Sequence, residues 1–311
     1  MKKNDRIIVT GANGLLGNSL VKELEKQKFQ KIYKLNRKVC DLENKLETDK
    51  IVKKINPHYL FHCANKVYGI RGNSRNKFDM INTNNIINSN ILSAIKNLKI
   101  KKVIAIGSSA AYPDLKKVLK EEDFLKKEPH SSEFYYGISK RNLFYQLQAL
   151  KESKKIQFNY VIMNNLYGIG DNFDIENGHV IPALIHKCYL SQKFNKDFKV
   201  LGKVDDKRNF LNSIDAARAL IIIAQRSNDN LINLGSKNEI SIKNLANLIK
   251  KTANNKNNIL WEKISNKAVK KRKLDLKKLD RLNFREEYTI EQGIKETYFW
   301  FKKKQESKRT I

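Results

Sequence analysis

A strand, a glycine-rich turn and a helix follow one another at the start of the chain. Arg6–Thr10 is a short apolar run of β-branched residues, which predicts a buried strand. Gly11, Gly14 and Gly17 come next in the spacing G-x-x-G-x-x-G and lead into the helix-periodic segment 18–26. Such glycines allow a tight turn and a close backbone approach, so a pyrophosphate can lie at the N-terminus of the helix. This context predicts dinucleotide binding, although glycines at this spacing can also be plain turn residues.

Strand-like and helix-like segments alternate over roughly the first 165 residues. Further short apolar runs predict four more buried strands: 31–35, 57–63, 102–106 and 158–163. A long helix is predicted at 79–98. This alternation is typical of a parallel sheet with helices on both faces. We therefore expect an α/β fold built on a Rossmann-type doubly wound parallel sheet.

After about residue 167 the predicted elements become shorter and more mixed. Apolar runs and helical periodicity indicate eight of them: 180–191, 198–201, 209–212, 215–225, 231–234, 241–252, 258–261 and 290–301. We expect residues 1–170 to form a dinucleotide-binding domain and residues 171–311 a smaller α/β substrate-binding lobe. The basic tail after about residue 302 is expected to be disordered.

The charge balance is strongly basic. The chain has 311 residues, with 62 Lys and Arg against 32 Asp and Glu, so its formal net charge is +30. A nucleic-acid partner held through phosphates is one interpretation. The lysines are spread over the whole chain without a basic module interleaved with aromatic residues, so we favour a solvated surface and expect no nucleic acid. Such a surface would still attract a phosphate-bearing ligand.

Neither the cysteines nor the five histidines show metal-ligand spacing. Cys40, Cys63 and Cys188 are far apart and odd in number, which also argues against a disulfide framework. No apolar run reaches the roughly 20 residues of a membrane-spanning helix. The N-terminus lacks the apolar core of a secretory signal. We expect a cytoplasmic protein with no metal and no membrane partner.

The end of the second predicted strand bears on the choice of dinucleotide. Asn36, Arg37 and Lys38 follow it, and none of them is acidic. This position faces the adenosine ribose, where an acid accepts from a free 2′-hydroxyl and an Arg suits a 2′-phosphate. The sequence therefore favours NADP over NAD. Asp41 could accept from the adenine amino group or cap a helix.

Tyr136 and Lys140 are four residues apart in a helical segment and share one face of it. A cation close to a phenol favours the phenolate and lowers a pKa that is otherwise about 10. Such a Tyr could exchange a proton with an alcohol or a ketone, although the same spacing also occurs on solvated helix faces. Ser108 adds weight because it follows the fourth strand, at the sheet edge where ligands bind in doubly wound folds.

The glycine turn, Ser108 and Tyr136-x-x-x-Lys140 together resemble the extended short-chain dehydrogenase/reductase family, which includes NAD-dependent epimerases and dehydratases. Within that family the chain is most similar to the GDP-L-fucose synthases. Five stretches carry this closer likeness: 107–113, 165–168, 171–173, 179–184 and 208–210. The likeness runs over nearly the whole chain and thins after Asn255.

The resemblance implies a role for each candidate catalytic residue. Tyr136 would protonate the sugar C4 oxygen as hydride arrives from the nicotinamide. Lys140 would lower the pKa of that phenol and bind the nicotinamide ribose, and Ser108 would hold the C4 oxygen. His179 would act in epimerisation at C3 and C5, although a lone His is more often a structural residue.

The resemblance also implies ligand-binding residues and an assembly. The cofactor-binding set is Gly11, Asn13, Gly14, Leu15, Gly17, Arg37, Asp41 and Lys140. The substrate-binding set is Asn165, His179, Lys187, Leu201, Arg208 and Lys273. A segment near 205–235 is expected to return to the dinucleotide-binding domain, and the protein is expected to form a homodimer.

Ala110 stands where the family has the cysteine that partners the histidine in epimerisation. Its methyl group can neither give nor take a proton. Inversion of a carbon usually needs one group on each face, so His179 alone falls short unless a water or Ser109 replaces the cysteine. This departure favours a reductase without epimerase activity.

Two further departures concern substrate binding. Leu201 replaces a family tryptophan near the nucleotide and offers no stacking face, so a guanine preference is open. Residues 266–273 replace a Pro/Gly-containing loop. Lys270, Arg272 or Lys273 could hold the diphosphate there, or the run could form a solvated basic surface.

We therefore expect an NADP-dependent oxidoreductase that reduces the C4 ketone of a 4-keto-6-deoxy sugar on a nucleotide diphosphate, with GDP as the expected nucleotide. Three alternatives remain open. The chain could be a complete GDP-L-fucose synthase with 3,5-epimerase and 4-reductase activity, or an NAD-recycling 4-epimerase or dehydratase. It could also be a nucleotide- or RNA-binding protein that has kept the fold, although intact Ser108, Tyr136 and Lys140 argue against this.

Overall fold

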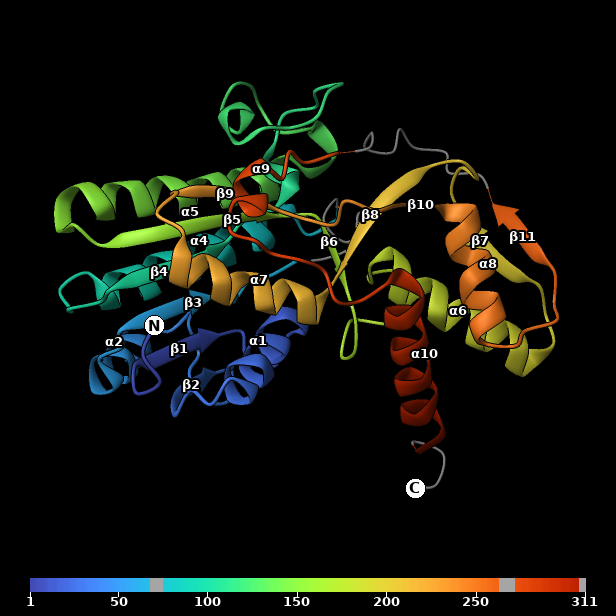
Figure 1. The fold of residues 1–311 in the computed structure, drawn as a ribbon, viewed down its shortest axis with the longest axis horizontal. Coiled ribbons are helices and arrows are strands. Elements are labelled where there is room, and N and C mark those ends of the chain that lie inside the picture. Colours follow the sequence, from blue (N-terminus) through green and yellow to red (C-terminus); the bar gives the residue numbers. More distant parts are fainter. Residues whose placement is uncertain (68–74, 263–271, 308–311) are drawn as a thin grey trace.

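A six-stranded parallel sheet forms the centre of the larger lobe (Figure 1). The computed structural model describes residues 1–67, 75–262 and 272–307. The strand order is β2-β1-β3-β4-β5-β9. The strands are β1 (Arg6–Thr10), β2 (Lys31–Leu35), β3 (Tyr59–His62), β4 (Lys102–Ile106), β5 (Gln157–Met163) and β9 (Leu231–Leu234). The predicted doubly wound parallel sheet is confirmed.

Helices bury both faces of this sheet. One face packs against α2 (Lys45–Ile55), α4 (Lys77–Ile95) and α5 (Phe134–Lys154), and the other against α1 (Leu15–Lys26) and α7 (Ser213–Arg226). Side chains of β1 alternate between the two cores, with Ile8 in the first and Ile7 and Val9 in the second. Both sides of a central strand are thus apolar, which is why its sequence is a continuous apolar run.

Short strands and three helices make up the smaller lobe within the described residues (Figure 1). One small sheet has the order β10-β8-β6, with strands Glu239–Ser241, Lys207–Asn212 and Asn165–Tyr167. A second pairs β7 (Phe198–Leu201) with β11 (Ile259–Glu262). The helices are α6 (Val180–Phe194), α8 (Ile242–Thr252) and α10 (Ile290–Ser307). They share a core that includes Ile185, Leu245 and Tyr298.

Short helical segments complete the described part of the chain. They are the 3₁₀ turns η1 (Ser109–Ala111), η2 (Glu121–Asp123) and η3 (Ser131–Glu133), and helix α9 (Lys277–Asp280). None of the helices in the described part of the chain is long and apolar enough to cross a membrane.

The chain returns to the larger lobe twice. Residues 213–234 form α7 and β9, and β9 pairs with β5 at the edge of the large sheet. The second return was not predicted: Leu274 and Leu279 lie in the two cores of the large sheet, and Leu274 bridges to Leu119. Residues 272–284 therefore depart from the expected assignment of 171–311 to the substrate lobe.

The tail is not disordered from residue 302 as expected. Helix α10 continues to Ser307. Tyr298 and Phe301 are buried in the core of the smaller lobe and anchor the helix. The Lys302 ammonium lies 3.9 Å from the Glu306 carboxylate, an i,i+4 pair that supports the last turns. The basic residues of the tail therefore continue a helix that these two buried aromatic side chains hold in place.

Candidate active site

The glycine turn connects β1 to α1 at the carboxyl edge of the large sheet. Gly11 has a φ of +65°, and a Cβ atom there would lie 2.9 Å from the backbone of Ala64. A Cβ atom on Gly17 would overlap the Gly11 carbonyl oxygen. Gly14 is the N-cap residue of α1, and its turn has no side-chain cap hydrogen bond. The first-turn amides therefore fit the pyrophosphate of a dinucleotide.

Asn13 and Leu15 are the other residues of this turn that were predicted to bind the cofactor. The Asn36 amide donates to Asn13 Oδ1 at 3.4 Å, which ties the turn to the end of β2. Leu15 is the first residue of α1 and is half-buried. The backbone N–H of Leu15 is one of the uncapped first-turn amides, and Asn13 precedes them.

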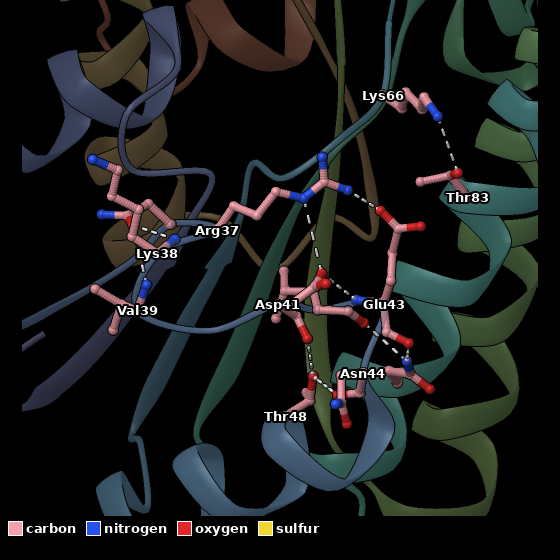
Figure 2. A network of polar contacts seen from close by, with 12 residues as sticks. Arg37, Lys38, Val39, Asp41, Glu43, Asn44, Thr48, Lys66 and Thr83 are labelled. Carbon is pink, nitrogen blue, oxygen red and sulfur yellow. Dashed lines mark hydrogen bonds and ion pairs between the residues drawn. The ribbon is translucent and has the colours of Figure 1, made fainter.

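Arg37 lies just after β2 and is bound by carboxylates (Figure 2). Its guanidinium pairs with Glu43, and its Nε lies 4.0 Å from Asp41 Oδ1. The side chain is 75% exposed, so these pairs are weak and a competing anion can displace them. The Asp41 carboxylate also accepts from the Glu43 backbone N–H at 3.1 Å. The Asp41 side chain therefore stabilises a turn through this hydrogen bond, at the position where a contact with adenine was expected.

Tyr136 lies in the first turn of α5 and is almost fully buried. It packs with Met80 and Ala110 in a small apolar cluster. Burial raises its pKa to about 12, and hydrogen bonds with Asn65 and Ser108 act in the opposite direction. Tyr136 is therefore protonated at neutral pH.

Lys140 lies one turn further along α5. Its Nζ donates to the Ile106 carbonyl oxygen at 2.9 Å and lies 5.7 Å from the centroid of the Tyr136 ring. Burial lowers the pKa of Lys140 to about 8, so the side chain stays mostly charged at pH 7. Sequence reasoning expected Lys140 to lower the pKa of Tyr136. Burial instead raises the pKa of the phenol, and the contacts that act in the lowering direction come from Asn65 and Ser108.

Hydrogen bonds between side chains and the backbone link Ser108 to η1 and η1 to α5. The Ser108 hydroxyl accepts from the Ala110 N–H at 3.2 Å and caps η1. The Arg141 guanidinium donates to the Ala111 carbonyl at 2.9 Å. These contacts hold the end of β4 against the first turns of α5. The structure thus brings Ser108, Tyr136 and Lys140 together.

Asn65 was missed by the sequence analysis. Its Nδ2 donates to the Tyr136 hydroxyl oxygen at 3.3 Å. Asn65 follows β3 by three residues, at the same carboxyl edge as Ser108. Its position after a central strand of a doubly wound sheet was the signal that could have identified it.

His179 forms a separate pair in the smaller lobe. It is the N-cap residue of α6, and its Nδ1 lies 3.7 Å from Asp171 Oδ1. The carboxylate of Asp171 raises the pKa of the imidazole. The Asp171 Oδ2 atom is buried without a hydrogen-bond partner among the described residues.

The other predicted substrate-binding residues come from several elements of the smaller lobe. Asn165 lies on β6 and donates to the Asn209 carbonyl at 3.3 Å. The Arg208 Nη2 lies 3.4 Å from Asp206 Oδ2. Lys187 lies on α6, and Leu201 ends β7. Both are half-buried.

The basic run before α9 lies only partly within the described residues. Lys273 is exposed, and its carbonyl accepts from the Leu119 N–H at 2.8 Å. Arg272 pairs with Glu133 at 2.6 Å rather than lying exposed as a solvated basic side chain. Lys270 lies outside the described residues. Glu133 is the N-cap residue of α5, so this pair ties the returning segment to the helix that carries Tyr136.

The chain is similar to proteins of one family over most of its length. The model of the NAD dependent epimerase/dehydratase family matches residues 7–235. GDP-L-fucose synthase of Dictyostelium discoideum is 30% identical over 303 residues, covering 95% of this chain and 94% of the relative. GDP-L-colitose synthase of Yersinia pseudotuberculosis is 26% identical over 301 residues, covering 95% and 97%.

A solved structure extends the likeness to three dimensions. The crystal structure of a GDP-L-fucose synthetase from Naegleria fowleri bound to NADP has a TM-score of 0.89 at 32% identity, and the match covers 99% of this chain and 97% of that chain. The resemblance to extended short-chain dehydrogenases/reductases and the Rossmann-type fold are confirmed. The chain belongs to the NAD dependent epimerase/dehydratase family of enzymes.

Proposed function

We propose that the chain is an NADP-dependent oxidoreductase that reduces the C4 ketone of a 4-keto-6-deoxy sugar carried on GDP. The cluster of Ser108, Tyr136 and Lys140 beside an uncapped glycine turn is the observation that carries this proposal. The names of the relatives support a GDP-sugar substrate, and the NADP held by the Naegleria fowleri structure supports the cofactor.

The side chains divide the chemistry between them. When bound, NADPH supplies hydride to the sugar C4. Tyr136 donates its proton to the C4 oxygen, and its raised pKa keeps that proton in place until the substrate arrives. The Ser108 hydroxyl orients the same oxygen. Lys140 holds the nicotinamide ribose, with a charge that is retained below a pKa of about 8.

Epimerisation at C3 and C5 is absent from this proposal because of Ala110. This residue is buried against Tyr136 and brings no titratable group to the site. The complete GDP-L-fucose synthase is the second candidate. The His179–Asp171 pair favours it, since Asp171 raises the pKa of His179 and could support one proton transfer.

Solvent exchange separates these two candidates. In D₂O, the wild type is expected to leave C3 and C5 of GDP-4-keto-6-deoxymannose protonated, because only His179 is present to act on them. Ala110→Cys is expected to introduce exchange, which NMR of the recovered nucleotide sugar would detect. Exchange at both carbons in the wild type would establish the bifunctional enzyme instead.

Arg37 sets the expected preference for NADP. Arg37→Gln should weaken NADPH binding about 10-fold through loss of a charge-assisted contact to the 2′-phosphate. NADH binding should change little, because it lacks that phosphate. Fluorescence titration with both cofactors measures the two effects, and Lys38→Gln is the matched control. Equal weakening of NADPH and NADH would show that Arg37 does not read the 2′-phosphate.

The activity itself is tested with a panel of 4-keto nucleotide sugars. NADPH oxidation is followed with GDP-, UDP- and dTDP-linked substrates, and products are identified by NMR. We expect turnover with the GDP-linked ketone. Turnover only with another nucleotide would overturn the proposed base, and no oxidation with any ketone would overturn the reductase.

The proposed assembly is a homodimer through α4 and α5. Phe78, Tyr135 and Tyr145 are large exposed side chains on these two helices. Large apolar side chains that stay exposed on neighbouring helices fit an interface between subunits. Sedimentation should therefore give a dimer that Tyr145→Glu weakens, and a wild-type monomer would contradict the assignment.

A further inference from the structure

Asn65 approaches the reacting oxygen of Tyr136 from a different element of the fold. Its Nδ2 lies 3.3 Å from the phenol oxygen, across 71 residues of sequence. A phenol oxygen can accept a hydrogen bond while it donates its own proton. The contact is therefore compatible with Tyr136 as an acid, and it persists after the proton has left.

The backbone on each side of Asn65 is held by hydrogen bonds. The Ala64 N–H donates to Thr10 Oγ1 at 3.0 Å. The Lys66 N–H donates to Asn84 Oδ1 at 2.7 Å, and Asn84 Nδ2 donates back to the Lys66 carbonyl at 2.9 Å. These contacts reach β1 on one side and α4 on the other. The amide of Asn65 is thus presented in a preorganised position.

The Lys66 ammonium makes its hydrogen bond elsewhere than at the Tyr136 oxygen. Its Nζ donates to the Thr83 hydroxyl at 3.5 Å (Figure 2). Lys140 donates to the Ile106 carbonyl. Glu133 disfavours the phenolate form of Tyr136, because its negative charge raises the pKa of the phenol. The Asn65 amide is a neutral donor at the Tyr136 oxygen. It therefore stabilises the phenolate in a way that neither Lys66 nor Lys140 does in this arrangement.

We propose that Asn65 is a further catalytic residue, whose amide stabilises the Tyr136 phenolate as it forms. This rests on the proposed reduction. As hydride bonds to C4, the carbonyl π bond breaks and the C4 oxygen takes the proton of Tyr136. The ketone is reduced to an alcohol, the dihydronicotinamide is oxidised, and the phenolate regains a proton from water. Hydrogen bonds to charged acceptors are stronger than those to neutral ones, so the contact strengthens toward the transition state.

A spectroscopic test examines the contact without any substrate. The side-chain amide resonances of Asn65, assigned with Asn65→Leu, are compared between the wild type and Tyr136→Phe. They should shift when the phenol oxygen is removed. The Asn142 amide, which donates to Asn85 Oδ1 at 3.3 Å, is the internal control and should stay in place. An Asn65 resonance that does not move would overturn the proposal.

A kinetic test examines the catalytic role. Asn65→Leu keeps the shape of the side chain without its donor and should lower kcat about 10-fold, the worth of one hydrogen bond to a charged group. The solvent isotope effect on kcat should rise, because proton transfer becomes slower. KM and NADPH affinity should stay unchanged, and Asn142→Leu should behave as the wild type.

The outcomes separate the two proposals. A shifted Asn65 resonance with unchanged kcat in Asn65→Leu would overturn the catalytic role while the reductase stands. A wild type without reductase activity would overturn the proposed function, and the catalytic role of Asn65 would fall with it. The resonance shift would still decide whether the contact exists.

Discussion

Tyr136→Phe is expected to lower NADPH-dependent turnover about 10³-fold, which is the usual contribution of a positioned general acid. The ring still fills its place beside Met80 and Ala110, so the fold and the cofactor site are preserved. NADPH affinity should therefore match the wild type in a fluorescence titration. Steady-state NADPH oxidation with the 4-keto sugar measures the loss.

Tyr135→Phe is the matched control for this variant. Tyr135 precedes Tyr136 in α5 and is exposed. Loss of its hydroxyl should leave turnover unchanged. If Tyr136→Phe kept a large share of the wild-type rate, proton transfer would have to come from another group, and the assignment of the acid would be wrong.

Gly17→Ala should weaken binding of the dinucleotide about 100-fold. Its new Cβ atom would overlap the Gly11 carbonyl oxygen, so the turn must open. Overpacking of this kind costs up to about 3 kcal/mol, which is roughly 100-fold in Kd if the strain falls on the bound state. Calorimetric or fluorescence titration with NADPH measures the change.

Gly14→Ala provides a graded comparison for that prediction. A Cβ atom on Gly14 would lie 3.3 Å from the Gly11 carbonyl oxygen, and its backbone is extended rather than left-handed. A much smaller loss of affinity is therefore expected. Equal losses of NADPH affinity in Gly17→Ala and Gly14→Ala would show that the close packing of this turn does not determine cofactor binding.

The large sheet and the glycine turn could be predicted because their signals are local. Ile7 and Ile8 face opposite cores, so burial on both sides appears in the sequence as one apolar run. Gly11 needs a positive φ that only glycine adopts readily, so the turn can be recognised from the glycine spacing alone. Tyr136 and Lys140 belong to the same helix, so their common face follows from spacing.

The rest of the site depends on contacts between distant segments. Asn65 reaches Tyr136 only because β3 and β4 are neighbours in the sheet and α5 follows β4. The pair of Arg272 with Glu133 joins residues 139 apart. The pKa of Tyr136 depends on its burial, which residue spacing does not report. These features required the three-dimensional arrangement.

Hydride delivery to C4 with Tyr136 as the acid underlies all of these expectations. The decisive measurement uses NADPH that carries deuterium at both positions of the nicotinamide C4, with GDP-4-keto-6-deoxymannose as substrate and NMR of the product. A single deuterium is expected on the sugar C4, formed together with an equal amount of NADP⁺ and lost in Tyr136→Phe. A product without deuterium at C4, or one formed at the wild-type rate by Tyr136→Phe, would contradict this mechanism.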